Sequence, residues 1–510
     1  MPRRRPLPLI AKTGATAAVI LLVESVIADA SILLPLAALG WIVALALTRP
    51  VVRRDRQARV ALACAMLFVA TMVDDPGPLG VLLFLVAMVM AALLPRRRFD
   101  HAIAWGLRIA WLVIAAIVLP LRDVSKLTAV RQRRRTPGVS IAGIATALLL
   151  PVAGGALFLA LFASANPLID RAFASIVLPD PVTVIWRSLV AGIVLLPVWA
   201  TLRPLPHVTL WTPAASGPVL PQPGAATLIL SLATFNMIFA IQNALDIAFL
   251  WSGAALPAGV TMADYAHRGA YALIVTALLA GLFVLVTLRL GSAGAASPAV
   301  RRLVTVWIVQ NLLLVASSAL RTLDYVAVYS MTALRLAALI WMALVAVGLA
   351  LILWRLLRGR SAAWLVNANA LAAALVLTAC TIVDLGATAA AWNVRVAIAQ
   401  GARAAPDTCY LQQLGPSALV PLARLERQTR DPAMRDRIAS LRWSAQRSAM
   451  ISQASWNGWT WRNARRLAAV QAMVGAQPPR LRPAPYGRTC GAIDPPPPPP
   501  PAQLTKAPQR

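Results

Sequence analysis

The stretch Phe235–Tyr271 reads FNMIFAIQNALDIAFLWSGAALPAGVTMADYAHRGAY. Its first half is apolar enough to span a membrane as a helix, since about 20 helical residues cross the hydrocarbon core. That half also carries amide and carboxylate side chains, at Asn236, Gln242, Asn243 and Asp246. Polar groups at bilayer depth are costly and are candidates for a functional site by default. The stretch therefore predicts a membrane helix with a polar face.

The second half of the stretch is a short connection that precedes another apolar run. It carries three side chains suited to hydrogen bonding or charge, Tyr265, His267 and Arg268. Under the topology that the basic loops favour, this connection meets the outer surface. These residues are therefore predicted to form the outer rim of any site between the helices.

The composition extends the membrane interpretation to most of the chain. Of 510 residues, 59% are hydrophobic and only 13% are charged, and the mean hydropathy is +0.71. A soluble protein of this length needs more charge on its surface. A transmembrane barrel would show short alternating segments instead of long apolar runs. The predicted class is an all-α, polytopic transmembrane helical bundle.

Twelve apolar runs are candidate membrane spans, and eleven to thirteen spans are expected. The first two runs, to about residue 30 and at 33–47, are interpreted as a retained helical hairpin rather than a cleaved signal peptide. The others lie at 60–73, 79–94, 102–119, 140–163, 183–202, 225–251, 270–288, 303–320, 333–354 and 363–383.

Basic clusters at the ends of these runs predict the orientation. Residues 3–5, 49–59, 96–98, 289–302 and 355–360 are rich in arginine and favour the cytoplasm. The N-terminus is therefore expected inside and the C-terminus outside. A basic loop at 121–138 breaks the alternation, so the segment 102–119 either lies in the interface, re-enters the membrane or is miscounted. A boundary between sub-domains is possible there.

The net charge of +30 does not predict a nucleic-acid partner, because it is divided among these loops. The expected partner is the lipid bilayer, with anionic head groups in contact with the basic loops. A protein partner is left unknown.

The C-terminal part has a different composition. Residues 393–476 predict a small extramembrane domain with helices at 416–429, 432–449 and about 457–474. Its interleaved tryptophans and arginines either lie in the head-group region or form the core of that domain. Residues 477–510 are Pro-rich and are expected to be disordered. Cys409 and Cys490 suit a disulfide in an oxidising compartment, although the sequence does not establish their pairing.

A second polar face lies on a later helix, at Gln310, Asn311, Ser317, Ser318 and Arg321. Two polar faces of similar width suit either a lined cavity or a hydrogen-bonded helix pair. Asp246, if buried, needs a cationic partner, which Arg321, Arg335 or Arg268 can provide. Two further rim residues are predicted, Tyr325 and Tyr329, the first of which follows Arg321 by one helical turn.

Familiar catalytic motifs are absent from the sequence. It contains no phosphate-binding loop, no nucleophile elbow and no His-Glu-x-x-His motif. Its three histidines are far apart, so no metal site and no cofactor are predicted. An enzymatic activity is left uncertain, and no catalytic residue is assigned.

Several separate stretches resemble one family of bacterial multi-spanning proteins, known as domain of unknown function 4173, with its relative 4153. The resemblance spans about residues 15–470 and implies a bacterial inner-membrane protein without an established reaction. The matching stretches are FLALFASANP at 158–167, the runs 235–250 and 256–271, WIVQNLLLVASSALR at 307–321, YVAVYSMTALR at 325–335, AWNV at 391–394 and DTCYLQQLGPSALVP at 407–421.

Three functions remain open. The first is a membrane scaffold or sensor whose C-terminal domain binds a partner or lipid. The second is a transporter of an ion or small molecule, with a cavity between the two polar helices, although no inverted repeat is visible. The third is a membrane enzyme that acts on a lipid-linked substrate at the outer surface.

Overall fold

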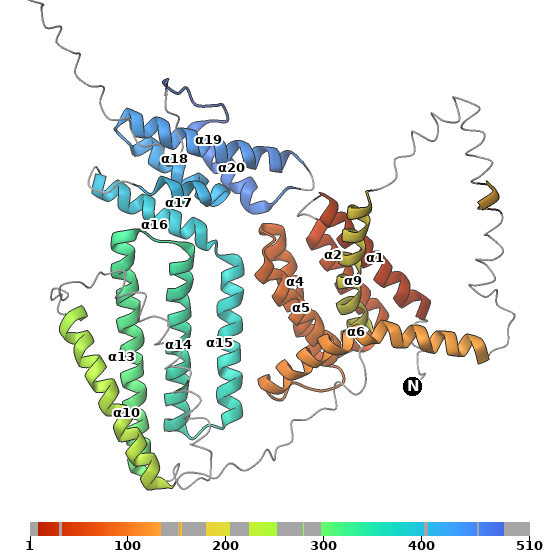
Figure 1. Cartoon of the computed structure of the whole chain (residues 1–510), viewed down its shortest axis with the longest axis horizontal. Helices are drawn as coiled ribbons and strands as arrows, with labels where there is room; N and C mark the ends of the chain where they lie inside the picture. The colour runs from red at the N-terminus through yellow and green to blue at the C-terminus, as the bar shows by residue number, and fades with distance from the viewer. Residues whose placement is uncertain are drawn as a thin grey trace, which may run out of the picture. The chain divides into compact units, whose positions relative to one another are not determined.

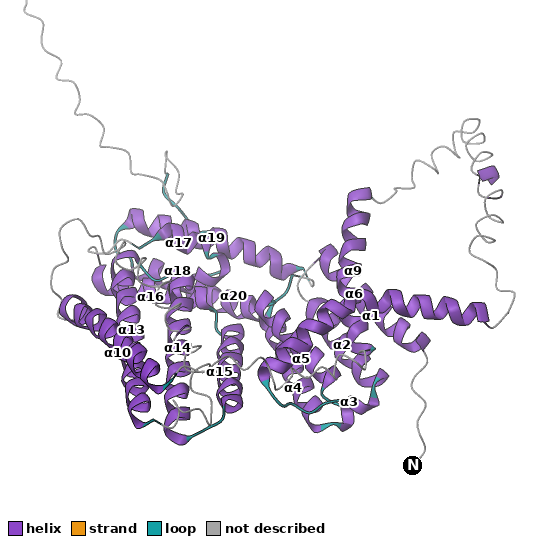
Figure 2. Cartoon of the chain, turned by 60° about the horizontal axis from the view of Figure 1, so that its bottom comes forward, coloured by secondary structure: helices purple, strands orange, loops and turns teal. Residues whose placement is uncertain are grey.

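The computed structural model describes residues 9–29, 33–133, 151, 153–155, 180–203, 224–251, 279, 297–401, 406–455 and 458–483. Figure 2 shows that the described part is built of helices and loops, and it contains no strand. Seven of the described helices are long and apolar enough to cross a membrane. The chain is therefore an all-α, multi-spanning helical bundle. The predicted runs 140–163 and 270–288 lie outside the described residues, apart from a few positions.

The chain divides into two compact units. The first takes in residues 1–69, 84–99 and 105–211, and the second takes in 70–83, 100–104 and 212–510. Residues 121–138 thus belong to the first unit. Its described helices are α1 (Leu9–Asp29), α2 (Leu33–Thr48), α3 (Pro50–Arg54), α4 (Arg56–Asp74), α5 (Pro78–Leu93), α6 (Ala102–Arg133) and α9 (Pro181–Leu202), of which α4, α5 and α6 also contribute residues to the second unit.

Arg49 joins three helices at one end of the first unit. It stands between α2 and α3, and its Nη1 donates to the carbonyl of Ala92 at 2.8 Å and to that of Thr201 at 2.9 Å. These carbonyls belong to the last turns of α5 and α9, where helices have carbonyls without an intrahelical partner. Burial, followed by the charge of Arg96, lowers the pKa of Arg49 to about 10. Arg49 therefore satisfies carbonyls at the C-terminal ends of both α5 and α9.

The helix α6 corrects the expected loop at 121–138. Its 32 residues continue from Ala102 through Pro120 to Arg133. A proline inside a helix removes one backbone hydrogen bond but does not have to end the helix when packing holds both sides. Here Asp123 lies beyond Pro120 and contacts the end of α9, accepting from Trp199 Nε1 at 3.0 Å and pairing with Arg203 at 3.3 Å. The basic residues after Pro120 are therefore helical as far as Arg133.

The second unit contains a row of membrane helices, seen in green and cyan in Figure 1. Packing of apolar residues joins α10 to α13 and α13 to α14, with Trp307 between Phe235 and Phe239 at its centre. The helices are α10 (Ala225–Asp246), continued by the π-helix η2 (Ile247–Trp251), then α13 (Pro298–Tyr329), α14 (Ala333–Arg358) and α15 (Ala362–Ile382).

A small helical domain follows α15 directly, and Figure 1 shows α16 across the upper ends of α13, α14 and α15. Asp384 caps α16 by accepting from the Ala387 N–H at 3.0 Å, a typical use of aspartate at a helix start. Apolar residues of α16, α18 and α19 form the domain's core around Leu422 and Ile438. The elements are α16 (Leu385–Gln400), α17 (Thr408–Gln413), η4 (Gly415–Ala418), α18 (Leu419–Gln428), α19 (Pro432–Ala454) and α20 (Trp461–Val474).

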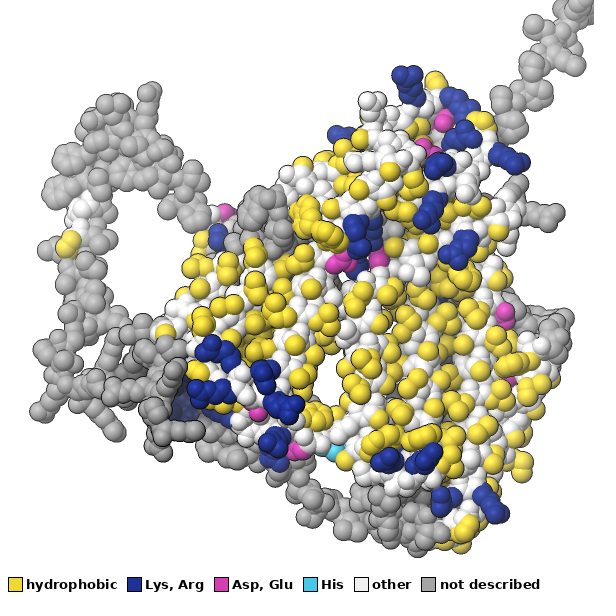
Figure 3. All heavy atoms as spheres, turned by 180° about the vertical axis from the view of Figure 1, so that it is seen from behind, with side chains coloured by type: hydrophobic (Ala, Val, Ile, Leu, Met, Phe, Trp, Pro, Cys, Tyr) yellow, Lys and Arg dark blue, Asp and Glu magenta, His cyan; other side chains and the backbone are white. Residues whose placement is uncertain are grey.

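The surface of the described residues shows the division that a bilayer requires. Figure 3 shows hydrophobic side chains over the membrane helices, while lysine and arginine gather at helix ends and on the C-terminal domain. Exposed apolar residues such as Met237, Ile241 and Leu245 on α10 belong to the lipid-facing surface. Burial of apolar surface in lipid explains why so many large hydrophobic side chains are exposed on this protein.

Candidate functional site

The two polar helices predicted from the sequence lie side by side as α10 and α13. Asn236 on α10 donates to the Leu303 carbonyl at 3.1 Å and accepts from the Gln310 amide at 3.3 Å. Two turns further along α10, Asn243 donates to the Gln310 carbonyl at 3.3 Å. Residue numbers rise together on both helices, so the helices run in the same direction. Amide side chains here connect the two helices directly.

An ion pair lies at the end of this interface. Asp246 is fully buried, and its Oδ1 pairs with Nη2 of Arg321, which is 8% exposed. Gln242 donates to the same oxygen at 3.0 Å from one turn earlier on α10. The partner that the sequence required for Asp246 is thus Arg321. Removing one member of a buried pair leaves an uncompensated charge, which makes the pair sensitive to substitution.

Three acceptor oxygens of this interface have no hydrogen-bond partner among the described residues. They are Asn243 Oδ1, Asp246 Oδ2 and Gln310 Oε1. An unsatisfied buried acceptor costs roughly 1–3 kcal/mol, so a donor such as a water or a ligand would stabilise the interface. Immediately after Asp246 the helix becomes the π-helix η2, a form often found at functional sites. Trp251 at its end donates to Ser317 Oγ at 3.2 Å.

The ion pair is far from the basic end of α13. Arg301 and Arg302 stand in the first turn of that helix. At a rise of 1.5 Å per residue, Arg321 is about 30 Å further along the axis, which is the thickness of the hydrocarbon core. Asn311, which donates to the Trp307 carbonyl of its own helix at 2.7 Å, lies midway between them. The pair is therefore close to the end of the span that is opposite the arginines.

The connection from α13 to α14 contains a backbone conformation that L-residues rarely adopt. Ser330 has φ 67° and ψ 163°. Among the described residues, it is the only one other than glycine with a positive φ. Arg335 holds this connection by donating to the Tyr329 carbonyl at 2.7 Å and to the Ser330 carbonyl. Its guanidinium also lies 4.4 Å from the ring centre of Tyr325. The ring centres of Tyr325 and Tyr329 are 4.6 Å apart. Strained residues persist when neighbours over-determine them.

The C-terminal domain binds the same connection from the other side. Met331 N–H donates to Asn393 Oδ1 at 2.7 Å, and Asn393 Nδ2 donates to the Met331 carbonyl at 2.8 Å. The Ala333 N–H donates to the Tyr410 hydroxyl at 2.7 Å. Asn393 therefore satisfies both backbone groups of Met331, much as a neighbouring β-strand would. The domain and the membrane helices are joined here by specific hydrogen bonds and by apolar packing around Met331.

A second junction of the C-terminal domain is ionic, and we name it the arginine latch. Its cations come from α20, where Arg462 pairs with Asp74 at 2.8 Å and with Asp75 at 3.0 Å. Arg465 also pairs with Asp74, at 2.8 Å, and Arg466 pairs with Asp384. The acids belong to the α4–α5 turn and to the α15–α16 turn. The latch therefore ties α20 to two turns that lead into membrane helices.

Asp384 is the most constrained acid of the arginine latch. It caps α16, accepts from the Ser417 hydroxyl at 2.8 Å and pairs with Arg466. Burial alone would raise the pKa of this carboxyl, but the Ala387 and Ser417 hydrogen bonds and the charges of Arg466 and Arg462 outweigh burial and lower the pKa. The carboxylate is therefore the stable form in the folded protein.

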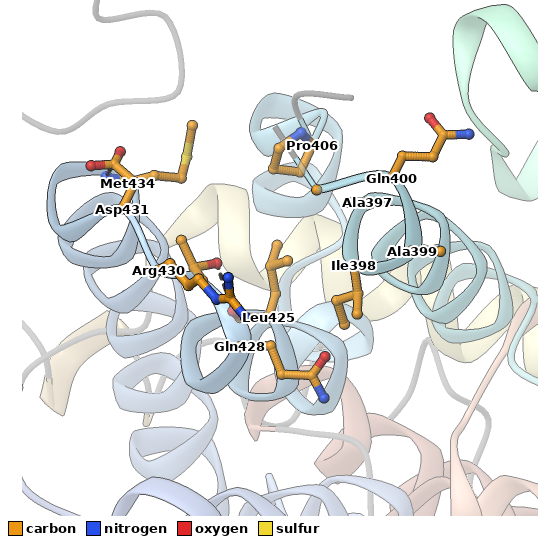
Figure 4. Close-up of a pocket in the computed structure, with 12 residues that line it drawn as sticks. Ala397, Ile398, Ala399, Gln400, Pro406, Leu425, Gln428, Arg430, Asp431 and Met434 are labelled. Carbon is orange, nitrogen blue, oxygen red and sulfur yellow. Dashed lines mark hydrogen bonds between the residues drawn. The ribbon is translucent and has the colours of Figure 1, made fainter. Parts of the chain in front are cut away.

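A cavity of about 800 Å³ opens within the C-terminal domain. Figure 4 shows residues of α16 on one side, Arg430, Asp431 and Met434 on the other, and Leu425 and Gln428 between them. Its size falls in the range of small-molecule sites, which are mostly apolar with a few placed polar groups. We call it the α16–α19 cavity, and it is lined by Ala397, Ile398, Ala399, Gln400, Gly401, Pro406, Leu425, Gln428, Thr429, Arg430, Asp431 and Met434.

The structure brings together most of the sequence-predicted cluster, but not Arg335. That residue contacts Tyr325 and Tyr329, two of the five predicted rim residues, instead of Asp246. Tyr265, His267 and Arg268 lie outside the described residues, and the enzyme hypothesis rests on them. Sequence reasoning gave no role to Asn393 and Tyr410, although both stand in the stretches AWNV and DTCY that carry the family resemblance. A polar side chain in a short, recognisable motif was the available signal.

Among the described residues, no group of three or more histidine, cysteine, aspartate or glutamate side chains is arranged to hold a metal ion. Cys64 and Cys380 are free, whereas Cys409 is disulfide-bonded. Cys490, the fourth cysteine of the sequence, lies outside the described residues. The disulfide at Cys409 is in the C-terminal domain, at the start of α17.

Comparison with known proteins gives a family but no activity. Neither the curated proteins nor the solved structures contain a match to the chain. A family model described as "Domain of unknown function (DUF4153)" matches residues 61–425. The sequence resemblance had placed domain of unknown function 4173 first, and the comparison supports its relative instead. The matched region runs from within α4 to within α18, and it includes the α10–α13 interface and the α13–α14 connection. On this match, the chain belongs to the DUF4153 family.

Proposed function

We propose that the protein is a membrane sensor or scaffold of a bacterial inner membrane. In this proposal the C-terminal helical domain receives a ligand or partner, and the α13–α14 connection transmits that event to the membrane helices. The observation that carries the proposal is the pair of hydrogen bonds between Asn393 and the Met331 backbone. They attach the domain at the residue that directly follows the strained Ser330, rather than at an arbitrary surface.

The strain makes this connection suitable for transmission. A backbone such as that of Ser330 costs about 1–3 kcal/mol and relaxes when its neighbours release it. Arg335 holds it from α14, while Asn393 and Tyr410 hold the next residues from the domain. A change in the domain that weakens these hydrogen bonds would therefore allow the strained backbone at the end of α13 to relax. Arg321 stands two turns earlier on that same helix.

The contacts between the polar helices favour this proposal over transport. Asn236, Asn243 and Asp246 reach α13 directly by hydrogen bonds or an ion pair. Such contacts support helix pairing, which side-chain amides in membranes commonly provide. A cavity large enough for a ligand is found instead in the extramembrane domain.

The expected orientation supports a sensor that faces outward. The arginines at the start of α13 and the end of α14 favour the cytoplasm, while the domain attaches at the opposite ends of these helices. The basic clusters 49–59 and 96–98 favour the cytoplasm, so the α4–α5 turn between them is expected outside. Its acids Asp74 and Asp75 pair with the same domain. The disulfide at Cys409 suits an oxidising compartment.

Hydrogen exchange of the intact protein in lipid nanodiscs tests the transmission. Asn393→Ala removes both bonds to Met331, so we expect faster exchange in peptides that cover residues 325–336, and extending to Arg321. The control is Gln412→Ala, which truncates an exposed side chain of α17. Faster exchange confined to α16, with residues 321–336 unchanged, would contradict the proposal.

The unpartnered oxygens at Asn243, Asp246 and Gln310 favour a second candidate function, transport of an ion or small donor-rich molecule. This function predicts that Asp246→Asn changes flux in proteoliposomes while folding is retained, as judged by size-exclusion chromatography. Asp324→Asn, an exposed acid on α13, is the matched control. Equal flux through both variants and the unaltered protein would exclude a role for Asp246 in transport.

A further inference from the structure

We infer that the α16–α19 cavity binds a single-chain anionic amphiphile, such as a long-chain carboxylate or a lysophospholipid with a phosphate head group. This inference rests on the proposed function, because it names the ligand that the sensor domain would receive. Three properties of the cavity carry it: an apolar interior, an uncompensated arginine at its edge, and its place against the ends of the membrane helices.

The interior of the cavity suits an alkyl chain. Its lining includes Ala397 and Leu425 from the domain's core, and Ile398 and Met434 beside them. Ile398 remains 37% exposed although it is a large hydrophobic residue. Figure 4 shows Ile398 and Leu425 on adjacent sides of the same space. Covering this surface with methylene groups would remove apolar area from water, which is favourable at about 0.8 kcal/mol per buried methylene.

The charge at the edge of the cavity is positive. Arg430 is exposed, and none of the described residues forms an ion pair with it. The adjacent Asp431 is already engaged, because its carboxylate caps α19 by accepting from the Ala433 N–H at 3.2 Å and the Met434 N–H at 2.9 Å. A guanidinium with free donors pairs with carboxylate or phosphate through charge-assisted hydrogen bonds. The head group expected beside this apolar lining is therefore an anion.

The location of the cavity provides a source for such a ligand. The lining residues 397–401 form the end of α16, which begins three positions after α15 ends and lies across the upper ends of α13, α14 and α15 in Figure 1. Trp392 on the same helix is 45% exposed, as is common for aromatic residues in the head-group region. An amphiphile that leaves the bilayer surface would thus reach the cavity over a short distance.

The test uses the full chain in nanodiscs with a photoactivatable 16-carbon fatty acid, and its adducts are mapped by mass spectrometry. We expect adducts in peptides that contain residues 397–401 or 425–434. Unlabelled laurate and lysophosphatidic acid should compete, and their relative strength distinguishes a carboxylate from a phosphate head group. Dodecyltrimethylammonium, which has the same chain and the opposite charge, should not compete. Up to the length that fills the cavity, each added methylene should strengthen competition about fourfold.

Two substitutions and a matched control connect the labelling to the cavity. Arg430→Gln removes the cationic anchor for the anionic head group and should lower cavity labelling about tenfold. Ile398→Asp places a carboxylate in the apolar lining and should do the same. Arg427→Gln is the control, because it removes an exposed arginine of α18 that does not line the cavity. The inference is overturned if adducts appear only in membrane helices, if the cationic amphiphile competes equally, or if Arg430→Gln behaves like Arg427→Gln.

A further variant separates this inference from the proposed function. Asn393→Ala breaks the junction with Met331 but leaves every residue that lines the cavity. Labelling that persists in this variant, without any response at residues 321–336 to laurate in the unaltered protein, would overturn transmission and keep the binding site. A normal exchange response to Asn393→Ala, with no labelling at the cavity, would overturn the ligand and keep transmission.

Discussion

At the scale of single residues, the buried pair of Asp246 and Arg321 should dominate the stability of the second unit. Asp246→Ala leaves the guanidinium of Arg321 buried without its counter-ion, which typically costs about 3–5 kcal/mol. We expect a clear drop in thermal stability in detergent, measured by the loss of helical circular dichroism.

A double substitution checks that the charge is the cause. Asp246→Asn with Arg321→Gln removes both charges and keeps amide groups in place, so stability should recover in part. Asp324→Asn, on an exposed position of the same helix, should change little. A double variant less stable than either single variant would contradict the interpretation.

Arg49 should have a comparable role in the first unit. Arg49→Gln removes the bonds that close α5 and α9, and a hydrogen bond to a charged group contributes about 1.5–3 kcal/mol. We expect lower thermal stability of the purified protein, measured as above. Arg53→Gln, an exposed arginine in α3, is the control. An equal loss in both variants would show that general loop charge, and not helix closure, is responsible.

Among the elements, the connection between α13 and α14 gives a substitution that should stabilise the protein. Glycine adopts the backbone angles of Ser330 without steric cost. Ser330→Gly should therefore raise stability by about 1 kcal/mol, after allowance for the added freedom of the unfolded chain. Ser330→Val should lower it, because a β-branched residue tolerates positive φ poorly. The midpoint of thermal unfolding measures both, and a lower midpoint for the glycine variant would contradict the strain.

The arginine latch should open in acid. The pKa of Asp384 is lowered in the folded protein, so its contribution is complete above the ordinary value near 3.8. That contribution is lost as the pH falls through the lowered pKa, because the unfolded or undocked carboxyl binds the proton more readily. Hydrogen exchange of α20 should therefore increase below about pH 4. In Asp384→Asn, which still accepts from Ser417, this acid-dependent step should be smaller, and an identical step would assign the transition to other acids.

The elements also show where sequence reasoning succeeds and where it fails. Hydropathy located α14 and α15 to within four residues at each end, because a bilayer imposes one length and one apolar composition on a span. It found only the central part of α13, at 303–320 of 298–329, because polar and charged residues follow Ala319. It ended α6 too early at 119, because Pro120 and the arginines that follow resemble a loop locally. The contact of Asp123 with Trp199 and Arg203 holds the part of α6 beyond Pro120 against α9. The sequence around Asp123 cannot reveal this contact, because Trp199 lies 76 residues away in the chain.

The candidate site was also only partly predictable, because local sequence patterns do not show which helices pack together. Helical periodicity placed Asp246 and Arg321 on facing sides, but it left Arg335 as an equal partner, since only the packing of α10 on α13 decides between them. Asn393 was not predictable from periodicity, because its partner is the backbone of Met331 and backbone groups are identical in every residue. The motif AWNV can draw attention to Asn393, but the backbone group that it binds can be recognised only in the folded protein.

For the whole molecule, the proposed orientation predicts which ends of the membrane helices are accessible from outside the cell. In a background of Cys64→Ser and Cys380→Ala, a membrane-impermeant maleimide should label Gln412→Cys on α17 in intact cells. Arg360→Cys, at the arginine-rich end of α14 and α15, should be labelled only after the cells are opened. The reverse pattern would place the C-terminal domain in the cytoplasm and would remove the case for an outward-facing sensor.

The arginine latch also bears on how the protein is made. Arg462 binds Asp74, a residue 388 positions earlier in the chain. At roughly 5–20 residues per second, a ribosome needs on the order of 20–80 s to travel between them. During that interval the acids of the α4–α5 turn wait without their arginines while the intervening helices enter the bilayer. Synthesis that stops before α20 therefore leaves two adjacent carboxylates without the arginines that pair with them in the finished protein.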